Sequence, residues 1–256
     1  MSTSIYVHFP WCLQKCPYCD FASGTIRRAE VPHRAYSDAV LRELAWRRER
    51  EPESFGQLAS IFFGGGTPSL WSAPELGRVV EAIRSAFECS DPELEITVEC
   101  NPSSLDERQA HALRAAGVNR LSIGVQAVDD DRLRYLGRLH DAAGALAAVR
   151  AAQSAMSRVS ADLMFGTPNQ TPSQFLSELD ALLELGLSHL SIYALTIEPN
   201  TQFGELHRKG KLPIARDDDY ADTFLAIEAK LRERGFEHYE VSNYARAGET
   251  ARHNQH

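Results

Sequence analysis

Three cysteines, Cys12, Cys16 and Cys19, lie within eight residues near the start of the chain. They follow Ser4–Phe9, whose apolar and aromatic side chains predict a short strand that ends before Pro10. Thiolates at this spacing are typical ligands of a metal centre. A cubane iron–sulfur cluster takes one thiolate per iron, so three cysteines would leave one iron open to an outside ligand. An open iron implies chemistry, and we therefore favour a cluster.

Structural zinc is the alternative for the same three cysteines. A closed tetrahedral zinc site needs a fourth protein ligand, which here would be His8, Asp20 or a remote residue. The two other cysteines, Cys89 and Cys100, are solitary and distant, so the pattern does not indicate a disulfide framework. We expect both to be buried or partly buried thiols.

The whole chain has the composition of an ordinary globular α/β protein. Its 256 residues suffice for one large domain, with 43% hydrophobic and 24% charged residues. A net charge of -8 argues against nucleic acid as a partner, because phosphate binding needs clustered Lys and Arg. No apolar run is long enough to cross a bilayer and no secretory leader precedes the first strand, so we expect a cytoplasmic protein.

Strand and helix patterns alternate along the chain. After the first strand, the predicted strands are 60–63, 95–99, 120–126, 159–165, 189–196 and, as a possible seventh, 237–244. The predicted helices are 34–50, 72–87, 104–117, 129–156 with a break at 137–141, 171–186 and 217–234. Capping boxes are predicted at Ser72/Glu75, Ser104/Glu107 and Thr171/Gln174.

Strands that alternate with amphipathic helices predict a parallel sheet with helices on its outer face. About six such units fall short of the eight of a closed TIM barrel, so we expect a partial, open (β/α)6 barrel. In such folds ligands bind at the carboxyl ends of the strands.

Each predicted strand ends in residues that could do chemistry. The cysteines follow the first strand, Gly65, Gly66 and Thr67 follow the second, Glu99 ends the third, Gln126 ends the fourth and Asp162 lies within the fifth. Glycines after a strand let a ligand approach backbone amides that a Cβ would shield, although a tight turn alone would also explain them. An aspartate inside an apolar strand needs a partner.

These residues recur in a set of motifs with a recognisable order. The motifs are Tyr6–Cys12, Phe63–Pro68, Glu99–Pro102, Ser122–Gln126 and Asp162–Pro168. The chain resembles the radical S-adenosylmethionine (SAM) superfamily, and within it the oxygen-independent coproporphyrinogen III oxidase family, over essentially its whole length. The resemblance implies a [4Fe-4S] cluster on Cys12, Cys16 and Cys19, whose open iron chelates SAM. The positions that match the family's SAM contacts are Tyr6, Gly65, Gly66, Thr67, Glu99, Gln126, Arg138 and Asp162.

Two branches of this family lead to different functions. The oxidase branch decarboxylates two propionates of coproporphyrinogen III and usually carries a fourth cysteine two residues after the third, where this chain has Phe21. The segment Cys16–Phe21 matches instead the haem chaperone branch, which resembles the oxidase but is thought to bind haem and pass it to acceptor proteins. We therefore expect a haem chaperone, with the oxidase as the alternative, and leave enzymatic activity open.

The last residues also match the chaperone branch. His253–His256 resembles the start of a motif that the family is thought to use for haem, which makes His253 a candidate haem ligand. We expect residues 1–236 to form the radical SAM barrel and residues 237–256 to begin a C-terminal region that the sequence cuts short. The resemblance also implies an electron donor for the cluster.

Overall fold

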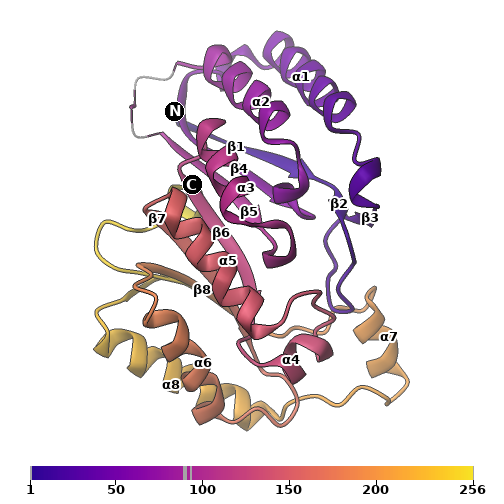
Figure 1. Cartoon of the computed structure of the whole chain (residues 1–256), viewed down its shortest axis with the longest axis vertical. Helices are drawn as coiled ribbons and strands as arrows, with labels where there is room; N and C mark the ends of the chain where they lie inside the picture. The colour runs from indigo at the N-terminus through magenta and orange to yellow at the C-terminus, as the bar shows by residue number, and fades with distance from the viewer. Residues whose placement is uncertain (1, 89–90, 93, 256) are drawn as a thin grey trace.

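The computed structural model describes residues 2–88, 91–92 and 94–255, so the prediction for Cys89 lies outside the described residues. A single curled sheet runs through the molecule, and helices cover its convex side (Figure 1). The eight strands of this sheet follow the order β1-β4-β5-β6-β7-β8-β10-β9. The prediction of a partial, open α/β barrel is confirmed.

Six of the eight strands are parallel. They are β1 (Ser2–Phe9), β4 (Gln57–Gly65), β5 (Glu95–Cys100), β6 (Arg120–Gln126), β7 (Arg158–Phe165) and β8 (His189–Ala194). The predicted seventh strand is instead two short antiparallel strands, β9 (Glu237–Glu240) and β10 (Asn243–Ala245), and β10 pairs with β8. A separate pair, β2 (Trp11–Cys12) and β3 (Gly24–Thr25), closes the cysteine loop.

The helices lie close to their predicted positions. They are α1 (His33–Arg50), α2 (Ala73–Ala86), α3 (Glu107–Ala115), α4 (Asp130–Tyr135), α5 (Ala142–Ala155), α6 (Pro172–Leu183), α7 (Gln202–Arg208) and α8 (Asp217–Glu233). α2 shows why these segments fold as they do, because Leu76, Val79, Val80 and Ile83 recur on one face and are all buried against the sheet. The sequence did not predict α7.

Two of the three predicted capping boxes are wrong. The Ser72 side chain makes no cap hydrogen bond, and Glu75 pairs with Arg78 instead of turning back to the backbone. Ser104 lies in a 3-10 turn, and α3 is capped two residues later by Asp106. The box of Thr171 and Gln174 is present.

Side chains alternate along each strand between the helix-covered core and the concave face. In β5, Ile96 and Val98 are buried in the core, while Glu99 lines a cavity on the other face. In β7, Leu163 lies in the core and Asp162 lines the same cavity. The concave face therefore presents polar groups at the carboxyl ends of the strands.

Residues 251–254 bridge β4 and β5 to the edge strand β9 at the opposite end of the open sheet. The Arg252 backbone N–H donates to Glu95 on β5 over 2.9 Å, and the Ala251 N–H donates to the Tyr239 hydroxyl on β9 over 3.2 Å. The ring of His253 lies flat on Phe62 of β4, with centroids 4.6 Å apart. Figure 1 accordingly shows both chain ends at this end of the sheet.

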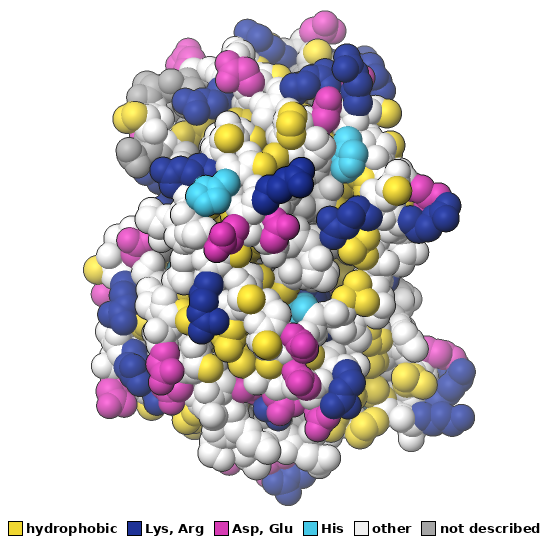
Figure 2. All heavy atoms as spheres, viewed as in Figure 1, with side chains coloured by type: hydrophobic (Ala, Val, Ile, Leu, Met, Phe, Trp, Pro, Cys, Tyr) yellow, Lys and Arg dark blue, Asp and Glu magenta, His cyan; other side chains and the backbone are white. Residues whose placement is uncertain are grey.

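Within the described residues, no helix combines the length and the apolar character that crossing a membrane requires. On the face shown in Figure 2, acidic side chains lie among the basic ones, so this face carries no broad field of positive charge.

Candidate functional site

A cavity of about 360 Å³ opens at the carboxyl ends of the strands. Its lining includes the three cysteines of the loop and the predicted residues Gly65, Gly66, Thr67, Glu99, Gln126, Arg138 and Asp162. Residues up to 150 positions apart in the sequence (12 to 162) thus meet at one edge of the sheet, as the carboxyl ends of parallel strands do. Ten of the eleven residues predicted for the cluster and SAM share this cavity, and Tyr6 is the exception.

The cysteine loop is held at its base and along its length. The Gly24 N–H donates to the Pro10 carbonyl over 2.8 Å, and the Ile26 N–H donates to the Cys12 carbonyl over 2.9 Å. Inside the loop, the Lys15 ammonium donates to the Phe21 carbonyl over 2.9 Å. These bonds fix a loop whose three thiols are free and partly accessible.

The donor set fits a cluster better than a single ion. No three His, Cys, Asp or Glu side chains in the described parts of the chain converge as the ligands of one ion would. A tetrahedral zinc centre requires such convergence, whereas each thiolate of a cubane cluster binds its own iron.

The glycines at the end of β4 serve the fold as well as the cavity. The Gly65 N–H donates to the Glu99 carboxylate, and the N–H groups of Gly66 and Thr67 donate to the carbonyls of Phe9 and Trp11. The protein itself therefore uses all three of these amides. A Cβ at Gly66 would come within 2.6 Å of the Trp11 carbonyl oxygen, so only glycine fits there.

Two carboxyl groups, Glu99 and Asp162, face the cavity. Burial, followed by the charge of Asp162, raises the pKa of Glu99 to about 8, although the Gly65 N–H opposes this shift. Burial also raises the pKa of Asp162, while the Ser122 hydroxyl, which donates over 3.0 Å, lowers it. The cavity thus holds carboxyl groups whose charge a cationic ligand would stabilise.

Gln126 has a strained backbone at the end of β6. Its φ of 68° lies in the left-handed region that residues other than glycine rarely adopt. At this position the chain leaves the strand, and the side-chain amide of Gln126 lies beside Gly124. A Cβ on Gly124 would be 3.0 Å from Gln126 Nε2. Strain of this kind concentrates at functional sites.

Arg138 reaches the cavity from the loop after α4. Its Nη1 donates to the Cys16 sulfur over 3.3 Å and its Nη2 to the Gly124 carbonyl over 2.9 Å. Its Nε is buried without a hydrogen-bond partner. A buried donor of this kind fits an anionic group, such as a carboxylate, that would bind in the cavity.

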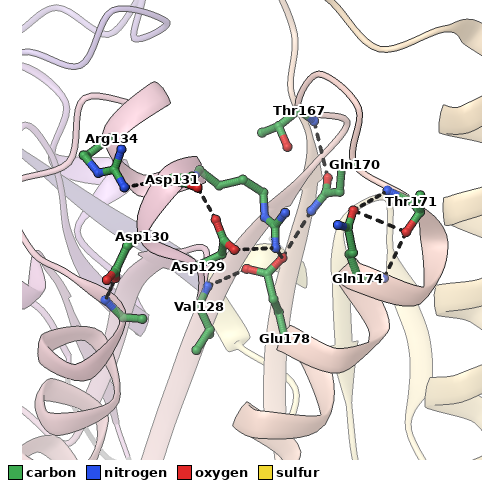
Figure 3. A network of polar contacts seen from close by, with 12 residues as sticks. Val128, Asp129, Asp130, Asp131, Arg134, Thr167, Gln170, Thr171, Gln174 and Glu178 are labelled. Atoms are coloured by element: carbon green, nitrogen blue, oxygen red, sulfur yellow. Dashed lines mark hydrogen bonds and ion pairs between the residues drawn. The ribbon is translucent and has the colours of Figure 1, made fainter.

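A buried polar network fixes α4, the helix just before Arg138 (Figure 3). The Glu178 carboxylate on α6 pairs with Arg132 on α4 at 2.8 Å and accepts the Val128 backbone N–H over 2.5 Å. Gln170 donates to the same carboxylate over 3.3 Å, and its amide oxygen accepts the Gly166 N–H over 2.9 Å. The network ties the loops after β6 and β7 to α6.

Two predicted residues lie outside the cavity lining. Tyr6 is 49% exposed, and its hydroxyl contacts His8 Nδ1 at 3.3 Å. The predicted haem ligand His253 is stacked on Phe62 and, with centroids 6.1 Å apart, on Tyr6. The two predicted residues thus contact each other on the concave face, away from the cysteines.

Sequence reasoning missed several residues of the cavity. Ser122, Met164 and Tyr193 line it. Ser122 lies four positions from Gln126, and Met164 lies two positions from Asp162, each pair on one strand. That period of two could have identified Ser122 and Met164. α7 had no such signal, yet the Phe203 N–H donates to the Pro17 carbonyl in the cysteine loop over 2.8 Å.

Comparison with known proteins agrees with this geometry. The model of the family "Radical SAM superfamily" matches residues 6–179. The curated protein "Heme chaperone HemW" of Haemophilus influenzae is 41% identical over 98% of this chain and 65% of its own length. "Radical S-adenosyl methionine domain-containing protein 1, mitochondrial" of Bos taurus is 39% identical over 98% of this chain and 56% of its own length.

A solved structure shares the fold over nearly the whole chain. The coproporphyrinogen III oxidase HemN of Escherichia coli, described as a radical SAM enzyme, superposes with a TM-score of 0.79 and 25% identity over 96% of this chain and 56% of its own. The chain thus spans less than two thirds of the length of these proteins. The predicted resemblance to the haem chaperone branch is confirmed, and by the family match across residues 6–179 the chain belongs to the radical SAM superfamily.

Proposed function

We propose that this chain binds a [4Fe-4S] cluster through Cys12, Cys16 and Cys19 and SAM at the adjoining strand ends, and that it acts in a haem chaperone. The observation that supports the cluster most directly is the set of three free thiols on one cavity wall beside a guanidinium. When bound, a cluster with one open iron supplies an electron to the SAM sulfonium.

The residues around the cavity suit the groups of SAM. Glu99 offers a carboxylate to the cationic amino group, and the buried Nε of Arg138 can donate to the SAM carboxylate. Gln126 and Asp162 offer acceptors to the ribose hydroxyls. Gly66 keeps the cavity wall flat, because no side chain fits there.

Haem and haem-acceptor proteins are the proposed partners. The curated relatives named as haem chaperones support this choice, and so does Phe21 at the position of the oxidase's extra cysteine. Phe21 is 57% exposed beside the cavity and offers an apolar surface. The second candidate is the oxidation of coproporphyrinogen III, which the structural likeness to that oxidase favours.

His253 is the proposed haem ligand of this chain. Because its ring stacks on Phe62, ligation of haem iron requires the ring to leave this position. An electron donor for the cluster completes the proposed partners, and free thiols at an open site suit a cytoplasmic, reducing compartment.

The first experiment tests the cluster and SAM. After anaerobic reconstitution with iron and sulfide, we expect a cubane cluster with absorption that dithionite bleaches and SAM binding measurable by calorimetry. A protein that takes up zinc but forms no cubane cluster would refute the proposal.

The second experiment separates chaperone from oxidase. We expect stoichiometric haem binding that weakens in His253→Ala, and no conversion of coproporphyrinogen III under anaerobic, reducing conditions with SAM. Phe21→Cys, which introduces the oxidase's cysteine, is the informative variant. Decarboxylation by the unaltered chain would favour the oxidase.

A further inference from the structure

The cationic side chain of Arg138 lies against a cysteine sulfur rather than a carboxylate. Its two terminal nitrogens donate to Cys16 Sγ and to the Gly124 carbonyl. None of the ion pairs in the described part of the chain includes Arg138, and Ser122 rather than Arg138 holds the nearby carboxylate of Asp162. Two acidic groups therefore lie beside this guanidinium, the Tyr18 phenol and the Cys16 thiol, and Cys16 is the predicted cluster ligand of the two.

The position of this guanidinium is built into the fold. The Arg138 N–H donates to the Leu133 carbonyl over 2.9 Å, which closes the end of α4. Gly137 allows the turn with a φ of 66°, and Pro17 of the cysteine loop packs where a Cβ of Gly137 would be, 2.6 Å away. The Glu178 network holds α4 from its other side (Figure 3). A flexible surface arginine would have none of these constraints.

Hydrogen bonds to cysteine sulfurs affect the reduction of iron–sulfur clusters. Reduction adds negative charge to the cluster and its thiolates, so a nearby N–H donor with a positive charge stabilises the reduced state. The effect is strong where water is excluded, since charges interact more strongly in a low dielectric. The Tyr18 phenol beside Cys16 and Arg138 adds to the exclusion of water.

We propose that Arg138 sets the reduction potential of the cluster through its hydrogen bond to Cys16, in addition to binding the carboxylate of SAM. This inference rests on the proposed function, because it needs a cluster on the three cysteines. Arg138 is then a positioning and tuning residue that raises the potential and so eases transfer of one electron from a low-potential donor protein to the cluster.

The same side chain couples ligand binding to reduction. One edge of the guanidinium faces the sulfur, while Nε is left for another acceptor. A carboxylate bound at Nε interacts with the same positive charge that stabilises the reduced cluster. SAM binding and the reduction potential of the cluster are therefore linked, and the linkage is reciprocal.

The test compares Arg138→Met and Arg138→Lys with a matched control on α4, the helix that ends just before Arg138. Arg134→Met removes the same charge from an exposed side chain that pairs with Asp131. Iron and sulfide content are measured first, and midpoint potentials follow by mediated redox titration monitored by EPR, without SAM. We expect a more negative potential in Arg138→Met, a smaller shift in Arg138→Lys, and the wild-type value in Arg134→Met.

Two further measurements distinguish failure of this inference from failure of the proposed function. We expect ENDOR to show an exchangeable proton coupled to the cluster in the wild type and in Arg134→Met but not in Arg138→Met. An unchanged SAM-free potential in an Arg138→Met protein with full iron content would overturn the inference, even if SAM binding weakened, and would leave the proposed function standing. A wild-type protein that forms no cubane cluster would refute the proposed function itself.

Discussion

Gly65 donates its backbone N–H to the Glu99 carboxylate over 3.1 Å, and this bond joins the ends of β4 and β5. Burial and the charge of Asp162 raise the pKa of Glu99, and the hydrogen bond from Gly65 is the effect that lowers it. In the ligand-free protein the ionised form of Glu99 is therefore unfavourable, and a bound cation would offset this cost.

The first prediction is that Glu99→Gln stabilises the ligand-free protein increasingly as the pH rises. The folded-state pKa of about 8 lies above the ordinary value of 4.5, so the folded protein binds the proton more tightly than the unfolded chain does. Wild-type stability is fully present below the ordinary value and falls as the pH rises toward 8. The gain from glutamine is at most on the order of 5 kcal/mol.

Thermal melts of both proteins between about pH 5 and about pH 8 measure this difference. A difference in Tm that stays constant over this range would contradict the predicted burial of Glu99.

The second prediction concerns the cysteines. Cys16→Ala should lose most of its cubane iron, because a thiolate of the cluster is missing. Cys100→Ala should keep it, because Cys100 is buried on the core side of β5 with its thiol on the Val98 carbonyl at 3.6 Å. Iron and sulfide analysis after reconstitution checks both. Equal iron content in the two variants would show that Cys16 is no ligand.

The third prediction is that Gly66→Ala lowers the stability of the fold itself, whether or not a ligand is bound. Its Cβ would meet the backbone oxygens of Trp11 at 2.6 Å and Phe9 at 2.9 Å, which cannot move independently of the loop. Overpacking of this kind costs about 1–3 kcal/mol. Gly24→Ala is the control, since nothing lies within 4 Å of its Cβ. Denaturant unfolding that gives equal stability for both variants would refute the contact.

The fourth prediction is that Glu178→Gln lowers stability by roughly 1–3 kcal/mol, because it removes the buried carboxylate that Arg132 contacts at 2.8 Å and leaves Arg132 its longer pair with Asp129 at 3.3 Å. Asp131→Asn, which removes an exposed pair with Arg134, should cost less than about 1 kcal/mol. Urea unfolding of the two variants measures both effects. Should Glu178→Gln unfold with the Asp131→Asn midpoint, the network in Figure 3 contributes little.

The alternation of strands and helices was predictable because the long helices carry one apolar face, as Leu76 and Ile83 show in α2. The short elements were not. α7 has seven residues and depends on a contact between Phe203 and the Pro17 carbonyl, which no local pattern contains. The short strands β9 and β10 likewise form through pairing, β10 with β8 and β9 with β10, rather than through a strong periodicity of their own.

The cavity residues could be predicted because parallel strands end at one edge, which places Glu99 and Gln126 together. Their individual contacts could not. Arg138 meets Cys16 across 122 positions of sequence, and only the end of α4 decides which group the guanidinium faces. Tyr6 fell outside the cavity lining because its ring packs on Phe62, a partner that belongs to another strand.

The bridge made by residues 251–254 also sets an order of events during synthesis. Glu95 receives the Arg252 N–H from 157 positions further along the chain. At typical translation rates the ribosome needs about 8–30 seconds to add that length. During this interval β5 has a buried carboxylate without its final donor, and the nascent half-barrel keeps one end open.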